Sequence, residues 1–216
     1  MFMPRRVIII GAGGHAQVIA DIMLRSADAG SDIVPIGYLD DNVDIIGQHR
    51  LDLPVLGSTD YLQFVPHDAV IIGIGDNRIR YRMFNSLQRS GESIVTVCHP
   101  SAVIAPDVSI GSGTVVAART VINPGSIIGA NVIINTGSII DHHCYIGNHT
   151  HIAPGSVLGG GVTVGEQSLV GMGAILLPQC TVGNGCTIGA GACVHRAVSD
   201  GLTVIGVPAR PLPRQA

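Results

Sequence analysis

VINPGSIIGANVIINTGSIIDHHCYIGNHTHIAPGSVLGGGVTV, residues 121–164, is the stretch of this sequence that decides the fold. Every sixth residue in it is Ile, Leu or Val, and this period runs without an insertion through sixteen positions from Ile104 to Val194. The residue four places after each of them is Val, Thr, Ser, Cys or Ala, and therefore small. Neither an α-helix nor an alternating strand produces a six-residue period, which is typical of a solenoid. Three hexapeptides form one coil, so residues 104–199 are predicted to form a parallel β-helix with the aliphatic side chains inside.

Three of the five cysteines fall in this register. Cys144, Cys180 and Cys186 occupy the small position, so they are predicted to fill the core and to have no catalytic role. The five cysteines form no C-x-x-C pair and their number is odd, which favours a reducing compartment over a disulfide framework. The apolar run at residues 7–10 is too short for a membrane span or a signal peptide, so it is predicted to be a first strand. We therefore expect a cytoplasmic protein.

Residues 5–97 have a different pattern, in which strand-like and helix-like segments alternate. The predicted strands are 6–10, 33–39, 69–75 and 93–97, and the predicted helices are 15–27 and 77–90. A third, short helix is predicted to begin at residues 58–60. Such alternation is typical of a small parallel α/β sheet, here called Rossmann-like. With a boundary near Pro100, two domains are predicted, residues 1–99 and 100–216.

The composition excludes several classes of protein. Hydrophobic residues make up 46% of the chain and charged residues 12%, a balance that excludes a disordered protein. The net charge is −3, no basic run exists, and only 3% of the residues are aromatic. Nucleic acid is therefore not an expected partner, because it would require a basic surface and stacking side chains.

The glycine-rich segment GAGGHA (11–16) lies between the first predicted strand and the first predicted helix. Glycines at this place let a phosphate approach the backbone, and the N-terminus of the helix attracts its negative charge. A nucleotide sugar is favoured over a redox dinucleotide, because about 97 residues precede the solenoid, too few for both halves of a dinucleotide fold plus a catalytic domain. The alternative is a glycine-rich turn that binds nothing.

Four of the nine histidines, His142, His143, His149 and His151, fall within ten residues. His142 and His143 occupy the third and fourth positions of a hexapeptide, which point outward or into a turn, so buried core histidines are not expected there. A solvated turn and a zinc site are the alternatives to catalysis. The H-x4-H spacing of the hexapeptide carbonic anhydrases, which bind zinc through histidines, is absent, so no metal is predicted.

Six motifs together resemble one family, the bacterial nucleotide-sugar N-acetyltransferases. They are GAGGHA (11–16), LDD (39–41), IGDNRIR (74–80), HPSAVIA (99–105), NTGSIIDHHCYIG (135–147) and the tail GVPAR (206–210). The family includes the UDP-bacillosamine and GDP-perosamine acetyltransferases and has sialic acid O-acetyltransferases as relatives. The resemblance implies a left-handed β-helix, acetyl-coenzyme A as co-substrate, and a homotrimer with coenzyme A between neighbouring solenoids.

The resemblance also implies roles for individual residues. His142 corresponds to the base that deprotonates the sugar amine, and an imidazole with a pKa of about 6.5 suits that task at neutral pH. The implied substrate-binding residues are Gly11, Gly13, Gly14, His15, Asp40, Asp41, Asn77 and Asn135. The implied coenzyme A contacts are His151, Gly160 and Met172. For Asp40 and Asp41 a solvated turn is the alternative, and for Asn77 it is helix capping.

The sequence departs from this family beside the base. The best-known relatives carry an acid after the catalytic histidine, where this chain has His143, while Asp141 precedes the base. Asp141 is therefore a candidate for orienting the imidazole of His142. Adjacent residues on a strand point to opposite sides, however, so the sequence leaves the identity of the orienting group open.

The predicted activity is acetyl-coenzyme A dependent N-acetylation, at the C4 amine, of a nucleotide-linked 4-amino-4,6-dideoxyhexose, as required for polysaccharide biosynthesis. Three alternatives remain from the sequence. They are O-acetylation of a sugar such as sialic acid, non-catalytic binding of a nucleotide sugar, and a metal-dependent hydratase.

Overall fold

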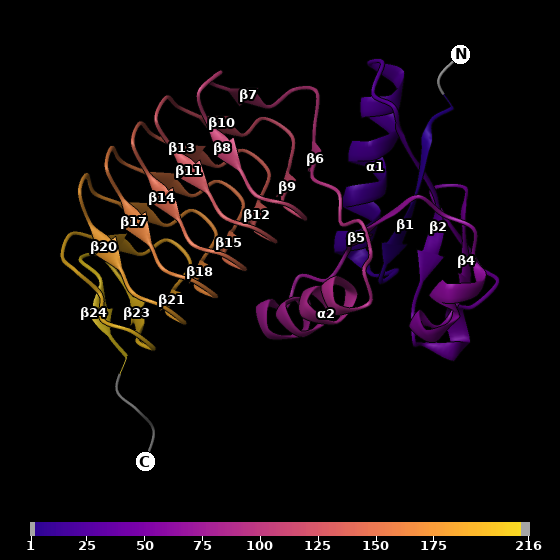
Figure 1. The fold of residues 1–216 in the computed structure, drawn as a ribbon. Coiled ribbons are helices and arrows are strands. Elements are labelled where there is room, and N and C mark those ends of the chain that lie inside the picture. The colour runs from indigo at the N-terminus through magenta and orange to yellow at the C-terminus, as the bar shows by residue number, and fades with distance from the viewer. Residues whose placement is uncertain (1–2, 213–216) are drawn as a thin grey trace. The chain divides into compact units, whose positions relative to one another are not determined.

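The computed structural model describes residues 3–212 and divides the chain into two compact units, Met1–Pro100 and Ser101–Ala216 (Figure 1). The first unit contains a five-stranded sheet in the order β3-β4-β2-β1-β5, parallel except for the β3–β4 pair. The strands of this sheet are β1 Arg5–Ile10, β2 Ile33–Leu39, β3 His49–Arg50, β4 Leu53–Gly57 and β5 Ala69–Ile72, and the short β6 Val97–Cys98 lies outside it. Its helices are α1 Gly14–Asp28 and α2 Asn77–Arg89, with 3-10 turns η1 Val43–Ile45 and η2 Thr59–Phe64.

The core of the first unit forms where α1 packs on the central strands. Val7–Ile10 of β1 are buried, as are the residues of α1 that recur three and four places apart, such as Ala16, Ile19 and Met23. A Cβ on Gly73 would lie 2.6 Å from the Cβ of Ala16, so only glycine fits at this contact between helix and sheet. The apolar period of α1 therefore sets which face meets the sheet.

Two predicted strands of this unit were too long. The strand predicted at 69–75 ends at Ile72, and Gly73 still donates its backbone N–H to the carbonyl of Ile10 while it packs against Ala16 of α1. The strand predicted at 93–97 is reduced to a bridge between Val70 and Ile94 and to β6. Short apolar runs at the edge of a sheet carry no period that marks where backbone pairing stops.

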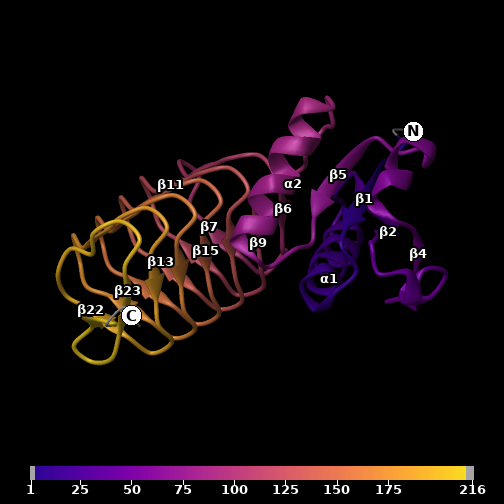
Figure 2. The same cartoon turned by 90° about the horizontal axis from the view of Figure 1, so that it is seen from below.

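The second unit is a parallel β-helix of two-residue strands, stacked coil upon coil (Figures 1 and 2). Between residues 103 and 194 each strand ends on one of the predicted aliphatic residues, and from Val116 onward all of these are buried. Partners lie 18 residues apart, as in the series Ile122, Ile140 and Leu158. Three faces result, in the orders β22-β19-β16-β13-β10-β7, β20-β17-β14-β11-β8 and β24-β23-β21-β18-β15-β12-β9.

The strands of the second unit have the following bounds. They are β7 Val103–Ile104, β8 Ser109–Ile110, β9 Val115–Val116, β10 Val121–Ile122, β11 Ile127–Ile128, β12 Ile133–Ile134, β13 Ile139–Ile140, β14 Tyr145–Ile146, β15 His151–Ile152, β16 Val157–Leu158, β17 Thr163–Val164, β18 Leu169–Val170, β19 Ile175–Leu176, β20 Thr181–Val182, β21 Thr187–Ile188, β22 Cys193–Val194, β23 Thr203–Ile205 and β24 Arg210–Pro211.

The small inward residues do more than fill the corners of the coils. The hydroxyls of Ser126, Thr150 and Ser168 donate hydrogen bonds of 2.8–2.9 Å to backbone carbonyls 15 residues later in the chain. Each hydroxyl therefore joins one coil to the next and satisfies a buried carbonyl. Among residues 3–212, no helix is long and apolar enough to cross a membrane.

Candidate active site

The turn after β13 presents two adjacent imidazoles, those of His142 and His143. Both residues are exposed, their Nδ1 atoms lie 3.1 Å apart, and their rings meet edge to face at 80°. The ring of His142 lies over Gly160, one coil later, where an added Cβ would be 2.5 Å from Cε1 and 2.6 Å from Nε2. The structure thus brings together two residues that the sequence predicted as base and cofactor contact.

Asp141 does not hold the imidazole of His142 in the described structure. Its Oδ1 accepts hydrogen bonds from the side chain of Asn123 at 2.9 Å and from the backbone N–H of His142 at 2.8 Å. These hydrogen bonds lower the pKa of the Asp141 carboxyl, so it is ionised at neutral pH. Asp141 Oδ1 is thus directed to the side chain of Asn123 and to the main chain of the turn, and a role of Asp141 in orienting the ring stays a prediction.

Asn135 and His151, predicted as substrate and cofactor contacts, lie together at another corner of the coils. Asn135 Nδ2 lies 3.2 Å from His151 Nε2, and Asn135 Oδ1 accepts from the backbone N–H of Thr136 at 2.8 Å. Met172 is exposed two coils after Thr136 in the same register, since the two positions differ by 36 residues. The clustered histidines are therefore separated: His142 and His143 lie in the turn after β13, and His151 lies on β15 beside Asn135.

His149 has a structural place that the sequence analysis missed. It is buried, has a left-handed backbone with φ +62°, and lies 2.8 Å through Nδ1 from the side chain of Asn131. The spacing from Asn131, one full coil, was the signal that could have identified this pair. Among the described residues, no group of three His, Cys, Asp or Glu side chains is placed to hold a metal ion.

In the first unit, the glycine-rich turn leaves the N-terminus of α1 open. Gly13 is the N-cap without a side-chain hydrogen bond, no acidic residue stands in the first turn, and a Cβ on Gly13 or Gly14 would meet no atom within 4 Å. Gly11 has a φ of +97°, which favours glycine. This terminus has the partial positive charge and the space that a phosphate requires.

Both predicted aspartates hold loops around this turn. Asp40 accepts a hydrogen bond of 2.7 Å from the backbone N–H of Ala12, inside the glycine-rich segment. Asp41 accepts hydrogen bonds of 2.8 Å from the backbone N–H and the hydroxyl of Thr59. These contacts fix the two carboxylates at the carboxyl end of β2, where ligands of parallel sheets bind.

A buried arginine completes this region. Arg80 is 1% exposed and donates to the carbonyl of Gly75 at 3.1 Å and to Asn77 Oδ1 at 2.8 Å. Burial lowers its pKa to about 10, so it is still charged at neutral pH. Burial and the charge of Arg80 lower the pKa of His15 to about 4, so His15 is neutral. Asp76 caps α2, accepting from the N–H groups of Arg78 and Ile79, so capping is one role of the IGDNRIR motif.

The sequence leaves open which of the alternating Arg78, Arg80 and Arg82 contacts a phosphate, and the structure buries Arg80. Its spacing from Phe84 and Leu87, four and seven residues later on the inner face of α2, would have indicated it.

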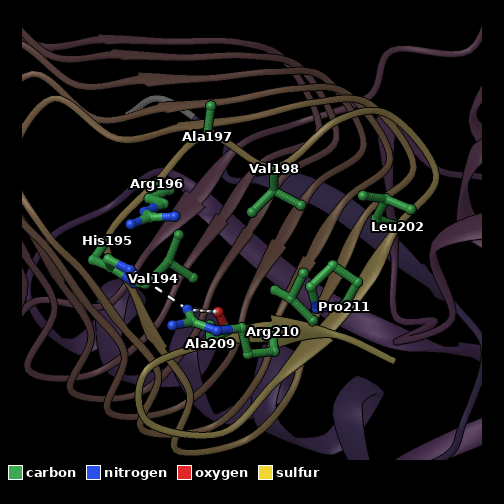
Figure 3. A pocket seen from close by; sticks show the side chains of 10 residues that line it. Val194, His195, Arg196, Ala197, Val198, Leu202, Ala209, Arg210 and Pro211 are labelled. Carbon is green, nitrogen blue, oxygen red and sulfur yellow. Dashed lines mark hydrogen bonds between the residues drawn. The ribbon is translucent and has the colours of Figure 1, made fainter. Parts of the chain in front are cut away.

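The last coil and the tail enclose a hollow of about 230 Å³ (Figure 3). Val194, Val198 and Leu202 form apolar parts of its lining, and the polar side chains at its wall are His195, Arg196 and Arg210. Arg210 Nη1 lies 3.5 Å from His195 Nε2, and His195 Nδ1 is buried with no hydrogen-bond partner among the described residues. The hollow therefore combines apolar surface with groups that bind anions.

Comparison with known proteins gives matches over both units. Residues 6–87 match the PglD N-terminal domain, and residues 125–160 and 161–196 match the bacterial transferase hexapeptide of six repeats. UDP-N-acetylbacillosamine N-acetyltransferase of Bacillus subtilis (strain 168) is 34% identical over 116 residues, which are 53% of this chain and 52% of that protein. The match thus spans about half the length of this curated relative.

Solved structures match over almost the whole chain. The acetyltransferase domain of PglB from Neisseria gonorrhoeae FA1090 is 36% identical, with a TM-score of 0.90, over 96% of this chain and all of that one. PerB from Caulobacter crescentus, in complex with CoA and GDP-perosamine, is 37% identical, with a TM-score of 0.88, over 96% of this chain and 97% of that one. These matches confirm the predicted fold class, a Rossmann-like unit followed by a left-handed β-helix.

Proposed function

The chain belongs to the bacterial nucleotide-sugar N-acetyltransferases of the hexapeptide-repeat class, and from this premise we propose that it acetylates the C4 amine of a nucleotide-linked 4-amino-4,6-dideoxyhexose with acetyl-coenzyme A. The observation that carries the proposal is the exposed imidazole of His142 above the bare backbone of Gly160. The domain of residues 1–99 would bind the nucleotide, and that of residues 100–216 would carry the acyl transfer.

Coenzyme A is proposed to lie along the edge of the solenoid that contains His142. PglB has been solved with acetyl coenzyme A and PerB with CoA. In this chain Gly160 and Arg196 follow His142 by one and three coils, and three coils span about 14 Å at roughly 4.8 Å each. The hollow beside Arg196 and Arg210 suits phosphates, and Gly160 leaves room for the pantetheine arm. His151 and Met172 are the other proposed contacts.

His142 is proposed to act as general base. Its Nε2 takes a proton from the sugar amine while the amine nitrogen forms a bond to the carbonyl carbon of the thioester. The tetrahedral intermediate then collapses, the C–S bond breaks, and the leaving thiolate accepts the proton that His142 holds. Asp141 is ionised and adjacent, and it favours the imidazolium that forms during this step, since opposite charges attract.

The nucleotide is proposed to bind at the open N-terminus of α1. Gly13 and Gly14 leave space for the diphosphate, and the buried charge of Arg80 lies near His15, which follows them. The remaining proposed contacts are Gly11, Asp40, Asp41 and Asn77 for the nucleotide and Asn135 for the sugar. PerB, whose structure contains GDP-perosamine, supports this class of substrate.

A homotrimer is proposed to bury one face of the solenoid. On the face built from β7 to β22, the outward residues of successive strands stack on one another and are all apolar. They are Val103, Val121, Ile139, Val157, Ile175 and Cys193. The corresponding residues of the β8 to β20 face include Ser109, Thr163 and Thr181. A continuous apolar stripe on one of three faces is the surface that a closed ring of identical subunits would cover.

The central test measures thiol release from acetyl-coenzyme A with a panel of UDP- and GDP-linked 4-amino sugars and their 4-hydroxy counterparts. We expect release with an amino sugar, and a loss of roughly 100- to 10,000-fold in kcat for His142→Asn. His49→Asn, at an exposed histidine of the first unit with no proposed role in the site, serves as the matched control for the assignment of the base. Release with no amino sugar would contradict the activity, and release only with hydroxyl acceptors would indicate O-acetylation.

The trimer has a separate test. Val157→Arg places a charge in the apolar stripe, and Thr163→Arg places the same charge on the neighbouring face. We expect light scattering to give the mass of three chains for the parent and for Thr163→Arg, and a smaller mass for Val157→Arg. A trimer that persists in Val157→Arg would show that another surface joins the subunits.

A further inference from the structure

The contact between His142 and His143 requires a defined arrangement of protons. Their Nδ1 atoms are 3.1 Å apart, a hydrogen-bond distance, so one nitrogen must carry the proton and the other must accept it. Two unprotonated nitrogens would lack a donor, and two N–H groups would repel each other. The pair therefore shares a single proton between the two Nδ1 atoms.

The proposed role of His142 decides which ring donates. Nδ1 of His142 is engaged by His143, so Nε2 is the nitrogen left to receive a proton from the amine. A neutral imidazole with its lone pair on Nε2 carries its hydrogen on Nδ1. His142 is then the donor in the contact, and His143 is the acceptor, with its own hydrogen on Nε2.

Both rings pack against glycines of neighbouring coils. His142 lies over Gly160, one coil later, and His143 lies over Gly125, one coil earlier, where an added Cβ would be 2.8 Å from Cδ2 of the ring. His143 has a φ of +58°, in the same corner where Gly125 and Gly161 have φ values of +73° and +70°. Gln179, two coils after His143 at the same corner, has a φ of +63°, so the left-handed backbone belongs to this type of turn and the argument for His143 rests on its contact with His142.

Asp141 does not accept the hydrogen bond from the imidazole of His142. Its Oδ1 is bonded to the backbone of His142 and to Asn123, so it supplies negative charge but no hydrogen bond to the ring. The ionisable groups described around the two rings are Asp141 in the same turn and Asp107, whose Oδ2 accepts from the backbone N–H of Gly125 beneath His143. Both carboxylates are bonded to groups other than the two rings, Asp141 to Asn123 and the backbone of His142, and Asp107 to the backbone of Gly125.

We propose that His143 is the positioning residue for the base, a neutral imidazole that accepts the Nδ1 proton of His142 and so keeps the Nε2 lone pair directed at the amine. This inference rests on the proposed function, because it needs His142 to act through Nε2. An imidazole that accepts the Nδ1 proton of His142 differs from a carboxylate in the same place in one property that can be measured. A proton added to His143 at low pH removes the acceptor, whereas a carboxylate stays ionised over the same range.

The first experiment compares kcat/KM against pH for the parent, His143→Ala, His143→Gln and His143→Glu. In the parent we expect an acid limb with a slope approaching 2, one proton for His142 and one for His143. His143→Glu keeps an acceptor and is expected to give a slope near 1 with activity retained. His143→Ala is expected to lower kcat roughly 10- to 100-fold with little change in KM, and His143→Gln, whose amide oxygen accepts, to restore part of it.

A second measurement reads the proton directly. Long-range 15N–1H spectra of histidine-labelled protein are expected to show His142 with its hydrogen on Nδ1, and a mixture of tautomers in His143→Ala. Parent kcat in His143→Ala, or an acid slope of 1 in both the parent and His143→Glu, would overturn the inference. An active His142→Asn variant would instead contradict the proposed base itself, so the two failures are distinguishable.

Discussion

The solenoid and the α/β unit place their candidate functional residues in opposite ways. In the solenoid the aliphatic positions repeat every six residues, and His142, His143 and Gly160 stand at turn positions outside that repeat. In the α/β unit no repeat exists, and Asp40 and Arg80 serve the packing of loops and helix ends at the place where a ligand is expected. In the repeat, the residues that form the core are therefore different from the candidate functional residues. In the irregular α/β unit, the same residues stabilise the fold and lie at the expected ligand site.

This difference has a physical basis in how each unit forms its core. Each coil contacts only its neighbours, so a residue at a turn is not required by distant parts of the chain. In the α/β unit the central strand β1 pairs with β2 and β5, which come from separate parts of the sequence. A change at a loop there affects several elements at once.

The largest effect is expected from a charge inside the solenoid. Ile146→Asp puts a carboxylate at a fully buried position, which is expected to cost more than about 4 kcal/mol of unfolding free energy. Tyr145→Asp, one residue earlier on the exposed side, is the matched control and should change little. Circular dichroism during thermal unfolding measures both. Similar stabilities of the two variants would mean that the six-residue register does not decide burial.

A smaller effect on the free energy of unfolding is expected from the protonation of His15 in the α/β unit. Its folded pKa of about 4 lies below the unfolded value of 6.5, so the unfolded chain binds more protons between these values. The free energy of unfolding should therefore decrease as the pH falls from about 6.5 to 4, by up to about 3 kcal/mol. Denaturant titrations of the parent and His15→Gln measure this slope, and His49→Gln, at an exposed site, is the control. An unchanged slope in His15→Gln would show that His15 is solvated.

The smallest effect on the free energy of unfolding is expected from replacing a glycine by alanine, and it should differ between the two units. Gly137, in a solenoid turn, has a φ of +67° and open space around it, so Gly137→Ala is expected to cost about 1 kcal/mol for backbone strain alone. Gly13, the N-cap of α1, has a φ of −74° and equally open space, so Gly13→Ala should be nearly neutral without ligand. Denaturant titration compares them.

The Gly13 variant also bears on ligand binding. A methyl group at Gly13 is expected to lower affinity for the nucleotide, measured by calorimetry, because it occupies the space proposed for phosphate. Nucleotide affinity equal to that of the parent would place the phosphates elsewhere.

Prediction from the sequence succeeded unevenly across the molecule. The buried aliphatics of the solenoid follow from the period alone, because a coil repeats the same environment every 18 residues. The ends of the strands predicted at 69–75 and 93–97 were wrong, since backbone pairing at a sheet edge depends on packing such as that of Gly73 against Ala16. Burial of His149 was missed because its partner Asn131 lies one coil away, and burial of Arg80 was missed although Phe84 and Leu87 mark the same inner face of α2.

Periodicity and turn chemistry are enough to predict the α/β unit, the register of the solenoid and the residues that depart from the repeat, because both are properties of neighbouring residues. Which side chains meet follows from the packing of the folded chain. It directed Asp141 to the backbone, set the imidazole of His143 against that of His142, and brought each ring over a glycine one coil away. The physical reason is that hydrogen-bond geometry depends on side-chain directions and on stacking between coils, which spacing along the chain does not specify.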